Sequence, residues 1–210
     1  MTSDTVSDLP IILLAAGQSR RMRGADKLLE EVDGLPLLRR QAELASAVTT
    51  GPVLVALPPA PHPRYRSLDA LAVDRVPVAD ADEGMNASLR TAFAALPRGA
   101  PAAMLLLADL PELTKEDLRV VLQAIDLKPE ALIWRGATED GKPGHPIVFA
   151  APLFEAFASL QGDGGGREVV AKAGSRVALI PLPGQHARRD LDTPEDWAAW
   201  RAERAARNSR

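Results

Sequence analysis

Short apolar runs alternate with longer stretches of mixed polarity along most of the chain. Three runs have the length and side-chain type of buried strands, without alternating polar positions: 11–14, 53–57 and 104–107. Weaker runs predict further strands at 73–78, 131–134, 147–149 and 176–182. Apolar residues at helical spacing and helix-start signals predict helices at 37–48, 66–71, 86–96, 114–125, 152–160, 167–172 and from 193 onward.

This alternation of strands and helices indicates an α/β protein. Strands that are apolar on both faces are typical of a parallel sheet covered by helices on both sides. We therefore predict a single-domain, three-layer α/β/α fold with a mostly parallel, Rossmann-like sheet. The domain is expected to span residues 10–204, between a flexible polar tail at 1–9 and a frayed basic tail at 205–210.

The first strong strand opens into small residues and then into a cationic segment. Ala15, Ala16 and Gly17 follow Leu14 and leave room for a ligand to approach the backbone amides. The basic residues come directly afterwards: Arg20, Arg21, Arg23 and Lys27. This order favours a cradle for a polyphosphate. The alternative is an ordinary strand-to-helix turn with solvated arginines.

Carboxylates occupy two other positions at which a predicted strand ends. Asp109 follows the strand at 104–107, and ligands of such sheets bind at the carboxyl ends of strands, so Asp109 should lie near Gly17. Asp190 and Asp192 share one side of the chain if their segment is extended. Mg²⁺ prefers one or two carboxylates with water and substrate phosphate, and Mn²⁺ suits the same donors. The alternative roles are a turn or cap for Asp109 and a helix cap for Asp192.

Other polar residues have more than one open interpretation each. A polar loop is predicted at 136–144, and His145 follows it as a loop histidine. A general-base role is conceivable at its unperturbed pKa, but a hydrogen bond to a substrate, or no functional contact, is favoured. Gly84 permits a turn with positive φ, and Asn86 or Ser88 either caps the next helix or contacts a base or ribose. Arg167, after three glycines, either meets a phosphate or is a solvated residue at a helix start.

Composition and missing motifs exclude several classes of function. A net charge of −3 gives no reason to expect nucleic acid as a partner, and the absence of cysteine excludes disulfides and thiolate chemistry. The first ten residues lack a signal-peptide pattern and no apolar run could span a membrane, so we expect a cytoplasmic protein without a membrane partner. Neither Gly-x-Gly-x-x-Gly nor a Walker A sequence is present, which leaves dinucleotide oxidoreductases and P-loop ATPases without support.

Five separated segments, in order along nearly the whole chain, resemble the motifs of the MobA-like nucleotidyltransferases. They are Leu14–Met22 with Lys27, Glu83–Leu89, Asp109-Leu110-Pro111, Gly144-His145-Pro146 and Asp190–Asp196. Ala16 and the Gly-His-Pro segment are similar to the molybdenum cofactor cytidylyltransferase branch, because the GTP-using branch tends to have glycine in place of Ala16. Arg23 stands where the family usually has glycine, and the spacing to Lys27 is one residue longer than usual.

The resemblance implies a nucleotide-diphospho-sugar-transferase-like fold and transfer of CMP from CTP to the terminal phosphate of molybdopterin cofactor, with release of pyrophosphate. It implies Arg21, Lys27 and Asp109 as catalytic residues, and His145 as the residue that faces the acceptor. The implied metal ligands for Mg²⁺, with Mn²⁺ as an alternative, are Asp109, Asp190 and Asp192. The implied nucleotide-binding residues are Leu14, Ala15, Ala16, Gly17, Arg21, Lys27, Gly84 and Ser88.

Two other functions remain open at this point. One is a nucleotidyltransferase that uses GTP or another NTP on a different phosphorylated acceptor. The other is a non-catalytic protein that binds the cofactor and inserts it into a molybdoenzyme apoprotein.

Overall fold

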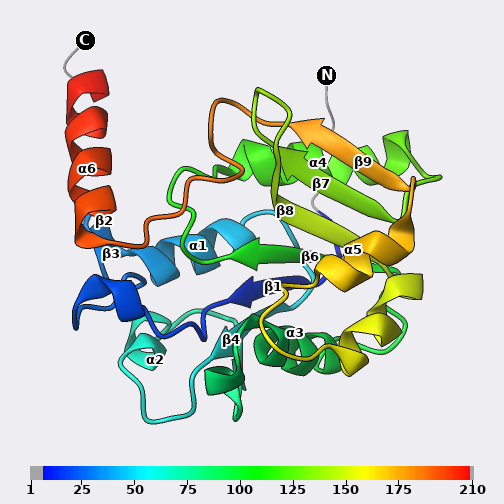
Figure 1. Ribbon diagram of the computed structural model, residues 1–210, viewed down its shortest axis with the longest axis horizontal. Helices are drawn as coiled ribbons and strands as arrows, with labels where there is room; N and C mark the ends of the chain where they lie inside the picture. Colours follow the sequence, from blue (N-terminus) through cyan, green and yellow to red (C-terminus); the bar gives the residue numbers. More distant parts are fainter. Residues whose placement is uncertain (1–6, 209–210) are drawn as a thin grey trace.

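A seven-stranded sheet runs through the centre of the molecule in the computed structural model, which describes residues 7–208 (Figure 1). Its strand order is β5-β4-β1-β6-β8-β7-β9, and β8 alone is antiparallel to its neighbours. The bounds are β1 Ile11–Leu14, β4 Val53–Leu57, β5 Asp74–Pro77, β6 Ala102–Leu107, β7 Ile133–Ala137, β8 Pro143–Ala150 and β9 Val177–Pro181. The mostly parallel sheet is thus confirmed.

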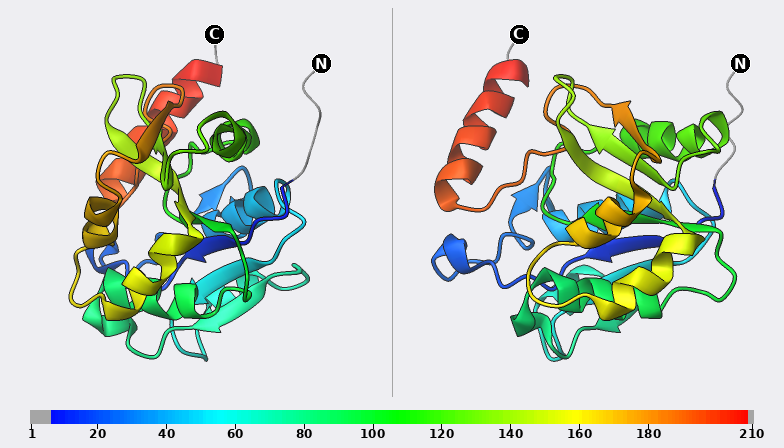
Figure 2. Two further views of the ribbon diagram at one scale, coloured as in Figure 1. Left: turned by 90° about the vertical axis from the view of Figure 1, so that its right-hand side faces the viewer. Right: turned by 45° about the vertical axis from the view of Figure 1, so that its right-hand side comes forward.

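Helices cover both faces of this sheet (Figure 2). Both faces are apolar, because successive side chains of the central strands point to opposite sides. Ile11 and Leu13 of β1 belong to one apolar core, whereas Ile12 and Leu14 belong to the other. The first core is closed by α1 (Leu37–Ser46) and α4 (Lys115–Leu127). The second is closed by α3 (Met85–Ala94), the 3₁₀ helix η3 (Ala151–Ser159) and α5 (Arg167–Ala173). These layers confirm the predicted three-layer arrangement.

The register of the central strands aligns their carboxyl ends. Leu14, the last residue of β1, pairs with Leu107, the last residue of β6. The segments that follow these strands therefore leave the sheet at one edge. The short elements η1 (Arg20–Met22), α2 (Arg64–Ser67) and η2 (Ala81–Glu83) also follow strands β1, β4 and β5.

A hairpin and the C-terminal helix extend the molecule beyond this edge. Strands β2 (Glu31–Val32) and β3 (Leu35–Pro36) flank a turn at 33–34, and α6 (Pro194–Asn208) stands beside them (Figure 1). Ion pairs of 2.8 Å from Arg201 to Glu30 and 2.7 Å from Arg204 to Asp33 join α6 to the hairpin. Among the described residues, no helix is both long and apolar enough to cross a membrane.

Some sequence-based expectations differ from the structure. The polar loop predicted at 136–144 is shorter, because β7 continues to Ala137 and β8 begins at Pro143, so His145 lies in a strand. Neither Asn86 nor Ser88 caps α3; both lie inside it, and Gly84 occupies the N-cap with a φ of 112°. Residues 7–9 precede β1 with Ser7 bridged to Thr49, and α6 includes residues 205–208. The rest of both predicted tails lies outside the described residues.

Candidate active site

A cavity of about 350 Å³ opens at the carboxyl edge of β1 and β6. Its walls come from four separate parts of the chain: the β1–η1 segment with Lys27 and Leu28, the η2–α3 segment, the end of β6, and Asp163. It contains most of the predicted nucleotide-binding residues together with Asp109: Leu14, Ala15, Ala16, Gly17, Lys27, Gly84 and Ser88. The structure therefore brings Gly17 and Asp109 to one cavity, as their positions after two strands of the sheet predicted.

Gly17 lines this cavity at a position where the fold itself does not require glycine. A Cβ atom built on Gly17 meets no atom of the described residues within 4 Å, apart from its own chain neighbours, and the φ of Gly17 is not in the left-handed region. Neither packing nor conformation therefore requires glycine here. The bare backbone instead leaves room in the cavity for close approach of a ligand, as a phosphate cradle needs.

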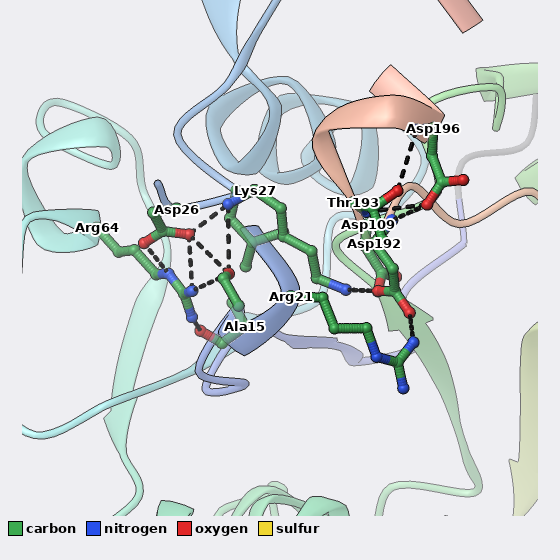
Figure 3. Close-up of polar contacts among 11 residues, drawn as sticks. Ala15, Arg21, Asp26, Lys27, Arg64, Asp109, Asp192, Thr193 and Asp196 are labelled. Atoms are coloured by element: carbon green, nitrogen blue, oxygen red, sulfur yellow. Dashed lines mark hydrogen bonds and ion pairs between the residues drawn. The ribbon is translucent and has the colours of Figure 1, made fainter. Parts of the chain in front are cut away.

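Lys27 reaches from this wall to two carboxylates at the edge of the cavity (Figure 3). Its Nζ lies 2.5 Å from Oδ2 of Asp109 and 2.6 Å from Oδ1 of Asp192. Burial by itself would lower the pKa of Lys27, but these two carboxylates outweigh it and raise the pKa above its ordinary value. Lys27 is thus a fixed positive charge at neutral pH.

Three carboxylates converge beside this ammonium group. One oxygen from each of Asp109, Asp190 and Asp192 lies within 4.8 Å of the others. Burial, and then the charge of Asp109, raise the pKa of Asp190, which is the effect expected of crowded acids. Oδ1 of Asp109 is buried and has no hydrogen-bond partner among the described residues. An orphaned carboxylate oxygen within a cluster of hard oxygen donors fits Mg²⁺ or Mn²⁺.

Arg21 lies at the rim of the carboxylate cluster and is not part of the cavity wall. Its guanidinium forms an ion pair with Asp192 and its side chain is 72% exposed. Arg23, at the position where the family usually has glycine, has a φ of 53° and pairs with Glu195 of α6 at 2.7 Å. Glycine adopts this left-handed backbone region without steric cost, which explains glycine as the usual residue here. Arg23 adopts the same conformation although its side chain disfavours it.

A buried arginine that the sequence analysis missed holds the cationic segment in place. Arg64 of α2 is 1% exposed, and its guanidinium bonds both carboxylate oxygens of Asp26 at 2.7 Å. It also donates to the Ala15 carbonyl at 2.6 Å and to Ser19 Oγ at 3.1 Å. The Lys27 N–H donates to the same hydroxyl at 3.3 Å (Figure 3). One side chain thereby fixes both ends of the segment between β1 and Lys27.

No local sequence signal could have identified Arg64. It stands in a proline-rich stretch, two positions before a second arginine, Arg66. Its hydrogen-bond partners are 38 to 49 positions away in the sequence. The cavity includes Arg20 of the predicted cradle and also polar side chains to which the sequence analysis gave no individual role: Gln18, Asp82, Glu83 and Asp163. Of these, Asp163 has a sequence signal, its place in a glycine-rich run. In the structure its carboxylate accepts a 2.7 Å hydrogen bond from the Met85 N–H.

A second cavity, of about 340 Å³, lies next to the first and contains His145. The two share Met85, Leu107 and Asp163 in their walls, so they are adjoining compartments. Burial, and then the charge of Arg135, lower the pKa of His145 to about 4. The ring is therefore neutral at pH 7 and would be a weak general base.

The chain matches known proteins along most of its length. The profile of the MobA-like NTP transferase domain matches residues 11–177. A Synechococcus elongatus protein named "Probable molybdenum cofactor guanylyltransferase" is 32% identical over 195 residues, which cover 90% of this chain and 95% of that protein. The matched profile ends before Asp190 and Asp192.

Solved structures share the fold at similar identity. The crystal structure of Rv0371c from Mycobacterium tuberculosis H37Rv has a TM-score of 0.78 and 28% identity, and the match covers 93% of this chain and 98% of that one. A manganese complex of Rv0371C from the same organism has a TM-score of 0.74 and 25% identity, with coverages of 92% and 97%.

Proposed function

Because this chain belongs to the MobA-like NTP transferase domain family, we propose that it transfers CMP from CTP to the terminal phosphate of molybdopterin cofactor and releases pyrophosphate. The observation that carries the proposal is the cavity in which the Gly17 backbone, Lys27 and Asp109 meet. It joins a cradle for phosphates to a cluster of metal-binding carboxylates. The adjoining cavity with His145 would receive the acceptor.

The proposed reaction needs no general base. An oxygen of the acceptor's phosphate attacks the α-phosphorus of CTP, and the bond from that phosphorus to the oxygen bridging to the β-phosphate breaks. A phosphoric anhydride forms and pyrophosphate takes the electron pair. A phosphomonoester is largely dianionic at neutral pH, since its second pKa is about 6. The low pKa of His145, about 4, agrees with a positioning role in place of proton abstraction.

The residues of the cavity would act by binding the negatively charged phosphates of the nucleotide and aligning them for transfer. The Gly17 amides and Lys27 would bind the β- and γ-phosphates, and Arg21 would approach them from the rim. Asp109, Asp190 and Asp192 would hold a divalent cation, which when bound neutralises charge on the α-phosphate. Gly84 and Ser88 would position the nucleoside at the start of α3.

Ala16 supports CTP as the nucleotide, and the names of relatives support GTP. Ala16 lines the cavity, and its methyl group would take space there that glycine would leave to a purine. The Synechococcus elongatus relative is named as a guanylyltransferase, which makes GMP transfer to the same acceptor the second candidate.

A nucleotide panel tests the proposal. Pyrophosphate release is measured with CTP, GTP, ATP or UTP, with Mg²⁺ or Mn²⁺, and with molybdopterin cofactor or a sugar phosphate as acceptor. We expect CTP with molybdopterin cofactor to be the most active pair. Release from none of the nucleotides would refute the enzymatic function and favour a binding or insertion protein.

The panel also includes a test of the role of Ala16. Since one methyl group in a binding pocket changes discrimination by about tenfold or more, Ala16→Gly should shift the CTP:GTP ratio of kcat/KM toward GTP by at least that factor. Ala100→Gly, in a loop outside both cavities, is the matched control and should keep the wild-type ratio. An unchanged ratio in Ala16→Gly would place base selection elsewhere in the cavity.

A further inference from the structure

The second cavity combines an apolar floor with unpaired positive charge. Its floor is formed by Leu105, Ile147 and Phe149 of strands β6 and β8. Its polar wall contains two arginines, Arg135 of β7 and Arg167 at the start of α5. The carboxylate in this wall, Asp163, accepts the Met85 N–H at the start of α3.

Arg135 is the more informative of the two arginines because it is half-buried. Its Nε donates to the Gly144 carbonyl at 2.8 Å, which orients the guanidinium. Within residues 7–208, its two terminal nitrogens have no recorded hydrogen bond or ion pair. Burial, and then the charge of Arg188, lower the pKa of Arg135. A desolvated guanidinium without a carboxylate is unfavourable unless a ligand supplies the negative charge.

The surroundings of His145 connect this arginine to the carboxylate cluster. His145 and Arg135 line the same cavity, and the charges of Arg135 and Asp109 shift the pKa of His145 in opposite directions. The ring is neutral at pH 7 and adds no positive charge of its own. An anion at Arg135 would thus lie in the second cavity, which shares Met85, Leu107 and Asp163 with the cavity that contains Gly17.

We propose that Arg135, assisted by Arg167 at the rim, binds the phosphate monoester of the acceptor while the apolar floor carries the acceptor's flat ring system. This inference rests on the proposed function and deepens it, because it names the residues that recognise the acceptor. A half-buried guanidinium whose two terminal nitrogens have no partner within the described part of the chain matches the two-point geometry of a phosphate. Arg167 is exposed and contributes less.

Binding of a fluorescent pterin in the absence of nucleotide tests this inference. The probes are 6-hydroxymethylpterin phosphate and the same pterin with a free hydroxyl group. We expect wild-type protein to bind the phosphate form at least about tenfold more tightly, as for a charge-assisted contact. Arg135→Met should remove that preference, Arg167→Met should weaken it, and Arg135→Lys should retain part of it. Arg98→Met, on an exposed turn outside both cavities, should behave as wild type.

The outcomes separate this inference from the proposed function. Equal binding of the two pterins by wild-type protein, or an unchanged preference in Arg135→Met, would overturn the role of Arg135 even if CTP is turned over. Arg135-dependent binding of the phosphate form, without pyrophosphate release from any nucleotide, would support the acceptor site while refuting the transfer. If thermal melting shows that Arg135→Met is unstable, Arg135→Lys and Arg167→Met are used in its place. The proposal would be overturned if both variants preferred the phosphorylated pterin as strongly as wild-type protein does.

Discussion

At the scale of single residues, Lys27 has two competing sets of partners. Its ammonium contacts Asp109 and Asp192, the same carboxylates that would hold a divalent cation. The proposed nucleotide would offer phosphates to the same group. Binding of the cation at these oxygens would release Lys27 from them, so cation and nucleotide should bind cooperatively.

Lys27→Ala should therefore have opposite effects on two measurements. Loss of a charge that stabilises the transferring phosphates should lower kcat/KM by about 100-fold or more. Mn²⁺ should bind more tightly in the absence of nucleotide, because no ammonium competes for the carboxylates. Titration of free Mn²⁺ by electron paramagnetic resonance checks the second effect, with Lys172→Ala on the exposed face of α5 as control. Unchanged Mn²⁺ affinity would contradict the competition.

Two residues that the sequence analysis identified, Gly17 and Asp109, come shortly after the ends of strands. Gly17 and Asp109 are placed by β1 and β6, whose ends are aligned by the Leu14–Leu107 pairing, so strand recognition is sufficient to bring them together. Arg64 could not be found in this way, because its role depends on how α2 packs against a segment far away in sequence. The same is true of Arg135, whose neighbours are set by the antiparallel strand β8.

At the scale of elements, the segment from Ala15 to Leu28 is held by contacts to another element. It has one short 3₁₀ turn of its own, with left-handed residues Ser19 and Arg23 on both sides. Arg64 of α2 supplies the constraint by binding the Ala15 carbonyl, Ser19 and Asp26. Asp26 in turn accepts the Leu28 N–H at 3.0 Å. The shape of the proposed phosphate cradle is therefore set by the ion pair of Arg64 with Asp26.

A pair of variants separates the structural and positioning roles of Arg64. Arg64→Met leaves Asp26 charged and unpaired, which should reduce the free energy of unfolding by about 3–5 kcal/mol. Arg64→Met with Asp26→Asn removes that charge and should regain much of the stability. The nucleotide KM should remain raised in the double variant, since nothing then holds the Ala15 carbonyl. Urea unfolding and steady-state kinetics measure the two quantities, and a wild-type KM in the double variant would argue against positioning.

Glycine explains where the prediction of elements was wrong. Gly136 and Gly144 bounded a predicted polar loop, yet both lie in strands. A Cβ on Gly144 would lie 2.1 Å from the Ala187 carbonyl oxygen, and one on Gly136 would lie 2.7 Å from that of His145. Glycine in a strand marks close approach of another backbone, and in sequence this cannot be told from a loop.

At the scale of the whole molecule, the site is complete only when the C-terminal segment returns to the carboxyl edge of the sheet. Asp190 and Asp192 precede α6, whose Trp197 and Trp200 are each 2% exposed in the core that α1 and α4 close. Arg201 and Arg204 join α6 to the hairpin that follows Lys27. The helix thus links the two parts of the chain that meet at the carboxylate cluster of Asp109, Asp190 and Asp192.

This connection predicts that packing of α6 controls metal affinity at a distance. Trp197→Ala should reduce the free energy of unfolding by about 3–5 kcal/mol and weaken Mn²⁺ binding, because Asp192 loses its anchor. Trp197→Phe should cost much less, since the buried Nε1 of Trp197 has no hydrogen-bond partner among the described residues and its loss leaves no group unpaired. Ala199→Ser, on the exposed side of α6, should change stability by no more than about 0.5 kcal/mol.

Calorimetric titration of Mn²⁺ below the melting temperature of each Trp197 variant separates stability from site geometry. We expect the affinity for Mn²⁺ to decrease from wild type to Trp197→Phe to Trp197→Ala, because each substitution further weakens the packing of α6 against the core. A folded Trp197→Ala protein that binds Mn²⁺ as wild type would show that Asp190 and Asp192 are held by their own segment. The Asp196 carboxylate, which accepts the N–H groups of Asp192 at 3.2 Å and Thr193 at 2.9 Å, would then be the local anchor.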